Sequence, residues 1–161
     1  EGIGTTFVIR VPFKIDLDAD KREESKDVSE KSIKGMHVLL AEDNELNMEI
    51  AEFLLQNEGA EVTKAWNGQE IVELFRKSES GEFDVILMDI MMPIINGYEA
   101  AKRIRSLDRE DAKKIPIIAM TANAFTEDRI RAKEAGMDEH VAKPIDVELL
   151  IKVIHKLVKH N

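Results

Sequence analysis

The chain has 161 residues, of which 43% are hydrophobic and 34% charged, and its formal net charge is −9. This mixture can bury a core, which excludes wholesale disorder, and the acidic balance argues against a nucleic-acid binder. The sequence has no cysteine, which excludes disulfides, thiolate catalysis and cysteine-ligated zinc. No apolar run approaches the length that crosses a bilayer, so we expect no membrane contact by this stretch. Because the first residue is Glu1, we expect a piece cut from a longer protein.

The sequence divides into three predicted segments. Residues 1–15 alternate apolar and polar side chains from Phe7 onward, which predicts a half-buried strand. Residues 16–35 mix acidic and basic side chains with few apolar ones, which predicts a charged linker. Residues 36–161 are expected to form the folded domain.

The third segment alternates predicted strands and helices. Short, continuous apolar runs are typical of strands that are covered on both faces of a parallel sheet. These runs are Val38–Ala41, Val85–Met88 and Ile117–Met120, with weaker candidates at Val62–Trp66 and His140–Ala142. Stretches with helical spacing lie between them, such as Leu46, Ile50, Phe53 and Leu54, and Asp146 is expected to cap the last helix. Five such units predict an α/β fold with an open, doubly wound sheet.

Polar residues follow the predicted strands at the points where they end. The first strand is followed by Glu42 and Asp43, the third ends in Asp89, the fourth in Thr121 and the fifth in Lys143. The carboxyl ends of parallel strands meet at one edge of a sheet, where open α/β folds bind their ligands. The sequence therefore predicts that three carboxylates, a hydroxyl and an ammonium group converge there.

The chemistry of this set points to phosphoryl transfer. Two like charges about 4 Å apart repel by roughly 4 kcal/mol at an effective dielectric near 20, so clustered carboxylates need a cation. Oxygen-only ligands favour Mg²⁺ or Mn²⁺, and carboxylates are known nucleophiles in aspartyl-phosphate chemistry. We assign Asp89 as the nucleophile and Glu42 and Asp43 as metal-side acids. The backbone carbonyl of Met91, in the turn after Asp89, is a further expected metal ligand.

The same residues occur in motifs that resemble a known family. Residues 36–161 resemble the receiver domain of two-component response regulators. The matching motifs are residues 41–44 (Ala-Glu-Asp-Asn), 88–93 with 96–100, 119–124, 135–138 and Lys143-Pro144. Their order and spacing, rather than any single motif, carry the resemblance.

The resemblance implies a fold, a reaction and several residue roles. It implies a flavodoxin-like sheet with strand order 2-1-3-4-5 and Mg²⁺-dependent phosphorylation of Asp89 from a phosphohistidine, followed by hydrolysis. Thr121 and Lys143 would approach the new phosphoryl oxygens. His140 stands where the family often has an aromatic switch residue, so its coupling to Thr121 departs from the common pattern. Met91 and Asn123 would flank the phosphoryl group and control access of water.

A second resemblance concerns the start of the chain. Residues 2–12 resemble the end of a histidine kinase ATPase domain, so the whole is similar to the C-terminal part of a hybrid sensor histidine kinase. The expected partners are a kinase phosphohistidine domain or a histidine phosphotransfer protein. The resemblance also implies a cytoplasmic location for this stretch, and it is compatible with a parent kinase that is anchored in a membrane. The stretch would lack an ATP site and catalyse only phosphorylation and dephosphorylation of its own Asp89. Self-association is expected through the face of the fourth helix, fifth strand and fifth helix, or through the N-terminal strand.

Two other functions remain open at this point. A Mg²⁺-dependent phosphatase can also form an aspartyl phosphate, but that class generally has a second Asp two residues after the nucleophile, where this chain has Met91. A phosphorylation-independent interaction domain could share the fold. The presence of Asp89, Thr121 and Lys143 argues against that reading.

Overall fold

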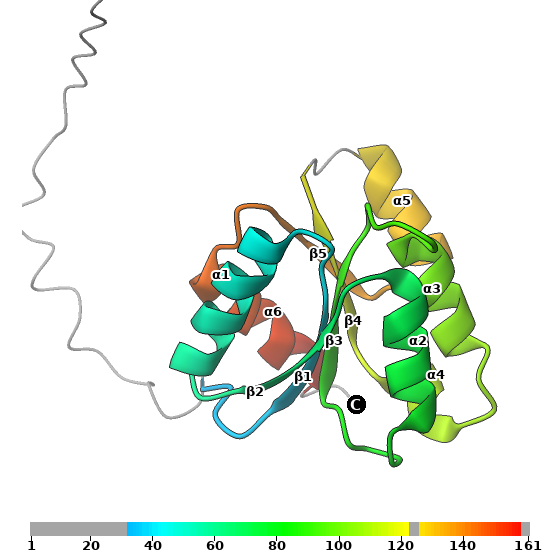
Figure 1. The fold of residues 1–161 in the computed structure, drawn as a ribbon, viewed down its shortest axis with the longest axis horizontal. Coiled ribbons are helices and arrows are strands. Elements are labelled where there is room, and N and C mark those ends of the chain that lie inside the picture. Colours follow the sequence, from blue (N-terminus) through cyan, green and yellow to red (C-terminus); the bar gives the residue numbers. More distant parts are fainter. Residues whose placement is uncertain (1–31, 123–125, 159–161) are drawn as a thin grey trace, which may run out of the picture.

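The structure is a computed structural model that describes residues 32–122 and 126–158 (Figure 1). The predicted N-terminal strand, most of the predicted linker and Asn123 lie outside the described residues. The elements in chain order are β1 (His37–Ala41), α1 (Glu45–Asn57), β2 (Glu61–Ala65), α2 (Gly68–Lys77), β3 (Val85–Asp89), α3 (Gly97–Arg105), α4 (Glu110–Lys114), β4 (Ile117–Thr121), α5 (Thr126–Glu134), β5 (Glu139–Ala142) and α6 (Val147–Val158).

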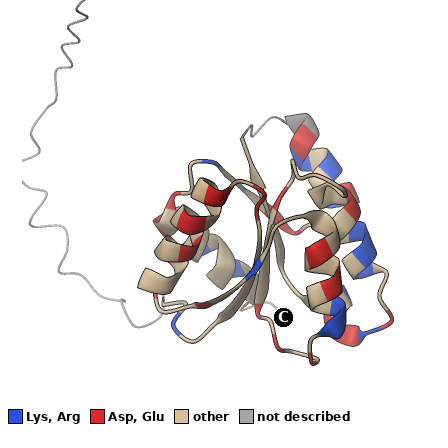
Figure 2. Ribbon diagram, in the orientation of Figure 1, with Lys and Arg blue, Asp and Glu red and all other residues tan. Residues whose placement is uncertain are grey.

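The strands form one parallel sheet in the order β2-β1-β3-β4-β5, which confirms the predicted fold class and strand order. Helices α1 and α6 cover one face of the sheet, and α2 to α5 cover the other (Figure 1). The three central strands are buried because both faces are covered, which explains their continuous apolar runs. Lys, Arg, Asp and Glu lie mainly on the helices and loops that surround the sheet (Figure 2).

Two details at the edges of the fold differ from the sequence prediction. Ile33, which lies within the predicted linker, is fully buried in the core with residues of α1 and α6, so packing extends at least three residues before the predicted domain start. The short helix α4 was not predicted, because in its five residues only Ala112 is buried and no apolar period can be recognised.

Asparagine side chains cap the two helices that follow strands β1 and β3. Asn44 caps α1 by accepting a hydrogen bond from the Asn47 backbone N–H, and Asn96 caps α3 by accepting one from Glu99. Gly97 starts α3 so close to β3 that a Cβ there would lie 2.3 Å from the carbonyl oxygen of Asp89. The absence of a side chain at this position lets the loop after Asp89 fold back against the strand end.

Candidate functional site: an acidic cluster at the carboxyl edge of the sheet

Three carboxylates come together where β1 and β3 end. Oxygen atoms of Glu42, Asp43 and Asp89 all lie within 4.8 Å of one another. Because β1 and β3 are hydrogen-bonded neighbours in parallel register, their last residues reach the same edge of the sheet. The side chain of Lys143, which follows β5, reaches the same cluster.

Lys143 balances part of this negative charge. Its Nζ lies 2.9 Å from Oδ2 of Asp89 and also donates a hydrogen bond to Oε2 of Glu42. Both acids are nearly inaccessible, with 5% of Asp89 and 2% of Glu42 exposed, whereas Asp43 is exposed. Asn47 from α1 donates a hydrogen bond of 3.0 Å to Glu42 Oε1. Each buried carboxylate therefore has a partner and is held in place.

The environment of Asp89 disfavours its charge. Burial raises the pKa of Asp89 and the neighbouring charge of Glu42 raises it too, while Lys143 and a 3.2 Å hydrogen bond from the Met91 backbone N–H act in the opposite direction without cancelling the shift. Burial alone would lower the pKa of Lys143, but its contacts with Glu42 and Asp89 outweigh burial and raise it. The lysine is therefore a cation near neutral pH, whereas the surroundings of the aspartate disfavour its ionised form.

The raised pKa of Asp89 predicts a pH-dependent stability difference. The group contributes stability below its ordinary pKa, near 4, and this contribution is lost as the pH rises through the higher folded-state value. We expect Asp89→Asn, which never ionises, to be more stable than the wild type at pH 7 and to unfold at a higher Tm. The difference should shrink as the pH falls toward 4.

Thermal unfolding in Mg²⁺-free buffer between pH 4 and 8 measures this difference. Asp108→Asn, at an exposed loop aspartate distant in sequence from the cluster, is the matched control and should follow the wild-type curve. An Asp89→Asn protein that is equally stable at every pH would show that the anion is not crowded.

Thr121 and His140 lie on the neighbouring strands β4 and β5. Thr121 is buried, and its backbone carbonyl accepts a 2.8 Å hydrogen bond from the Lys143 backbone N–H. Thr121 and His140 line the same small hollow under α5, together with Asp128 and Arg129. The structure thus places the two predicted switch residues near each other beneath α5, with one fifth of the His140 side chain exposed.

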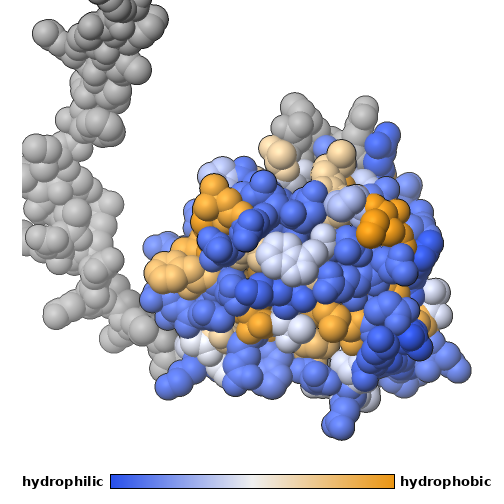
Figure 3. All heavy atoms as spheres, in the orientation of Figure 1, coloured by the Kyte–Doolittle hydropathy of each residue, from blue (hydrophilic) through white to orange (hydrophobic). Residues whose placement is uncertain are grey.

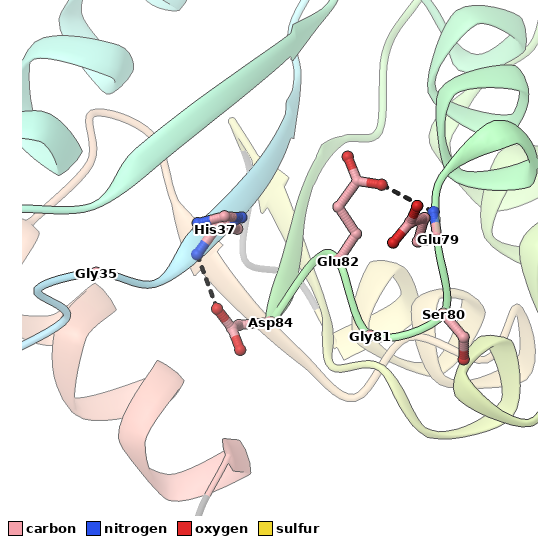
Figure 4. Close-up of a pocket in the computed structure, with 7 residues that line it drawn as sticks. All are labelled: Gly35, His37, Glu79, Ser80, Gly81, Glu82 and Asp84. Atoms are coloured by element: carbon pink, nitrogen blue, oxygen red, sulfur yellow. Dashed lines mark hydrogen bonds between the residues drawn. The ribbon is translucent and has the colours of Figure 1, made fainter.

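A separate pocket lies at the opposite end of the sheet, where β1 begins. It is lined by Gly35, His37 and the loop from Glu79 to Asp84 (Figure 4). Two of its acids already accept hydrogen bonds: Asp84 from the His37 backbone N–H and Glu82 from that of Glu79, both at 2.8 Å. The first contact joins the α2–β3 loop to the start of β1 and the second lies within that loop, so both acids serve to hold the fold together.

An apolar surface beside the acidic cluster was not predicted. The helical spacing of Leu46, Ile50 and Phe53 correctly indicates a helix, but these side chains are 62%, 48% and 68% exposed. The core side of α1 is instead formed by Met48, Ala51 and Leu55. A helix with two apolar stripes is a recognisable signal, because only one stripe can face the sheet. We name Leu46, Ile50 and Phe53 the α1 stripe.

Fold and site together define a class of protein: a parallel, doubly wound domain with an acid cluster and a lysine at the carboxyl edge of its sheet. Comparison with protein families identifies that class. Residues 38–155 match the model of the response regulator receiver domain, and the chain belongs to this family. The resemblance stated from the motifs is confirmed.

Individual relatives agree with this assignment. The chain is 40% identical over 120 residues to hybrid signal transduction histidine kinase I of Dictyostelium discoideum, a match that covers 73% of this chain but 7% of that kinase. The chain spans 13% of histidine kinase 1 of Arabidopsis thaliana, with 35% identity. The relatives first matched are thus much longer proteins that contain a receiver domain.

A solved structure supplies a comparison for the site. The receiver domain of a sensor histidine kinase from Pseudomonas aeruginosa is 34% identical, with a TM-score of 0.70, and the match covers 78% of this chain and 98% of that one. That structure holds a magnesium ion in its active-site cleft.

A second solved structure shows a receiver domain with a partner. The Saccharomyces cerevisiae receiver domain of the response regulator Ssk1, crystallised with the phosphotransfer protein Ypd1, is 29% identical with a TM-score of 0.69. The match covers 78% of this chain and 90% of that one.

In the present chain, no helix within residues 32–122 and 126–158 has the length and apolar character to span a bilayer.

Proposed function

We propose that this domain accepts a phosphoryl group on Asp89 from a phosphohistidine and passes it on in a phosphorelay. The observation that carries the proposal is the position of Asp89: buried at the end of a central strand, 2.9 Å from Lys143 and grouped with two further carboxylates. In the transfer, an Oδ of Asp89 attacks phosphorus and forms the new O–P bond. The N–P bond of the phosphohistidine breaks, and its electron pair returns to the imidazole nitrogen, which is left neutral or takes up a proton.

The donor set fits a hard divalent cation. Glu42, Asp43 and Asp89 offer oxygen atoms only, and Lys143 alone cannot neutralise three carboxylates. Mg²⁺, or Mn²⁺ in its place, would be held by these acids together with the Met91 carbonyl, and it would neutralise charge on the transferring group. The exposed Asp43 gives this position an open side toward solvent.

The remaining residues stabilise the product. Phosphorylation adds about −1.5 to −2 charges at Asp89, so Lys143 would shift its hydrogen bonds to the phosphoryl oxygens and the Thr121 hydroxyl would donate to them. Thr121 and His140 line the same region beneath α5, so a movement of Thr121 toward the phosphoryl group would change the surroundings of His140. Met91 is 78% exposed two residues after Asp89, a position from which it would limit the approach of water. Asn123 is proposed to act on the other side of the phosphoryl group.

The proposed partner is a histidine phosphotransfer protein that docks on the α1 stripe. The stripe begins at Leu46, four residues after Glu42, so a partner that presents phosphohistidine to Asp89 would also cover α1. Apolar atoms gather over α1 on the molecular surface (Figure 3). An apolar surface next to a charged pocket suits a partner that carries its reactive histidine on an apolar helix face.

The origin of the chain in a hybrid kinase is part of the proposal. It is supported by the long kinases that match this domain. The kinase ATPase remnant at residues 2–12, the cytoplasmic location, and self-association through the α5–β5–α6 face or the N-terminal strand stay predictions from the sequence.

A transfer experiment tests the relay function. The chain is mixed with Ypd1 phosphorylated on its histidine, with Mg²⁺ present, and the phosphoryl group is followed by gel electrophoresis. We expect it to move to the chain, and Phe53→Asp, which places a charge in the α1 stripe, to slow the transfer by about tenfold or more. Glu49→Asp, at an exposed position of the same helix, is the control. Release of many phosphates from small esters, with no transfer, would favour the phosphatase instead.

A further inference from the structure

The loop between β3 and α3 holds a residue that local backbone energetics disfavours. Ile94 has φ of +69°, the single non-glycine residue with positive φ among residues 32–122 and 126–158. The backbone N–H of Ile95 donates a 2.8 Å hydrogen bond to the carbonyl of Pro93, which makes Ile94 the centre of a three-residue γ-turn. The γ-turn with positive central φ is rare and strained, and a β-branched residue fits this region least well.

Packing of the Ile94 side chain in the folded domain does not explain this conformation. Its side chain is 74% exposed, whereas its neighbour Ile95 is buried against the start of α2. Asparagine or glycine would adopt the same backbone at lower cost, because both tolerate the left-handed region. The packing of this chain therefore explains the turn and the buried Ile95, but not an isoleucine at position 94.

The position of Ile94 near Asp89 explains why an apolar residue stands in this turn. Ile94 is three residues before Gly97, which lies against the carbonyl of Asp89, so chain length keeps it within about 11 Å of Gly97. A standard protein interface buries about 800 Å² on each partner, equivalent to a disc with a radius of about 16 Å. An interface of this size that is centred on the end of β3 would include Ile94.

We infer that Ile94 is a docking contact: its strained turn presents an apolar side chain to the phosphohistidine-bearing partner. The inference rests on the proposed function and adds a residue outside the acid cluster and the α1 stripe. Exposed Met91, three residues earlier, extends the same apolar rim around the buried Asp89. The turn would thus hold Ile94 ready for binding, so that the strain is present in the free domain and is offset by contact with the partner.

Ile94→Asn separates folding from docking. We expect Tm to rise by about 4 °C because asparagine relieves the turn, and transfer from phosphorylated Ypd1 to slow by about fivefold or more because the apolar contact is lost. Phosphorylation by acetyl phosphate with Mg²⁺ should be unchanged, since this donor is too small to touch the rim. Ile94→Met, which keeps an apolar side chain, should transfer within about twofold of the wild type.

The matched control is Ile130→Asn, an isoleucine that is 53% exposed on helix α5. It should give no rise in Tm and transfer at the wild-type rate. Wild-type transfer by Ile94→Asn, or a fall in its Tm, would overturn the inference, as would acceptance from acetyl phosphate without any acceptance from Ypd1. Failure of the wild type with acetyl phosphate would instead refute the proposed function itself.

Discussion

Asp43→Asn should reduce the Mg²⁺-dependent phosphorylation of the chain by about a hundredfold or more. Asp43 belongs to the carboxylate cluster but is exposed, so its substitution removes a proposed metal ligand with little effect on the core. Loss of residues that merely support metal ligands costs 10–100-fold in metal affinity or activity, and loss of a direct ligand should cost at least as much. The rate with acetyl phosphate, measured against Mg²⁺ concentration, provides the test.

The same variant should lose the stabilisation that Mg²⁺ confers. A cation that binds only the folded state raises its stability by about 2.7 kcal/mol at a hundredfold excess over Kd, so Tm of the wild type should rise with added Mg²⁺. Asp108→Asn provides the control for loss of one exposed acid and should behave as the wild type. An Asp43→Asn protein with the wild-type rate and the same Mg²⁺ response would remove Asp43 from the metal site.

Lys143→Met should destabilise the domain by about 3 kcal/mol in Mg²⁺-free buffer. The substitution keeps most of the side-chain length but leaves the buried carboxylates of Glu42 and Asp89 without their cation. Removal of one partner from a buried ion pair is costly because the remaining charge stays desolvated. Denaturant unfolding near pH 7 measures the loss.

Two further variants distinguish the loss of the lysine charge from a change in packing. Adding Asp89→Asn to Lys143→Met should restore part of the stability, because one crowded anion disappears, and the double-mutant cycle gives the coupling energy. Lys152→Met, at an exposed lysine of α6, should change stability by less than about 0.5 kcal/mol. Equal losses from Lys143→Met and from the double variant would mean that the ammonium does not compensate Asp89.

The order of strands and their polar ends made the site predictable. Because β1, β3, β4 and β5 are parallel, reading the residue after each apolar run was enough to bring together Glu42, Asp89 and Lys143, whose side chains the structure places in contact. The variants described above test the chemical roles assigned to these residues. Most of the fold could be predicted for the same reason: a buried parallel strand has a distinct apolar pattern.

Features without a local pattern could not be predicted. The burial of Ile33 depends on contacts with α1 and α6, which sequence spacing does not reveal. The two apolar stripes of α1 can be recognised in the sequence, but which of them faces the sheet cannot, since both sides of the helix carry apolar residues. The positive φ of Ile94 contradicts its intrinsic preference, because the loop around it is fixed by Gly97 and by packing of Ile95 on α2.

Intact-mass measurement after treatment with acetyl phosphate and Mg²⁺ tests the central claim most directly. We expect the wild-type chain to gain the mass of one phosphoryl group, and the gain to be absent both in Asp89→Asn and when Mg²⁺ is chelated. An adduct of equal size on Asp89→Asn, or no adduct on a folded wild-type chain, would contradict the assignment of Asp89 as the phosphoryl acceptor.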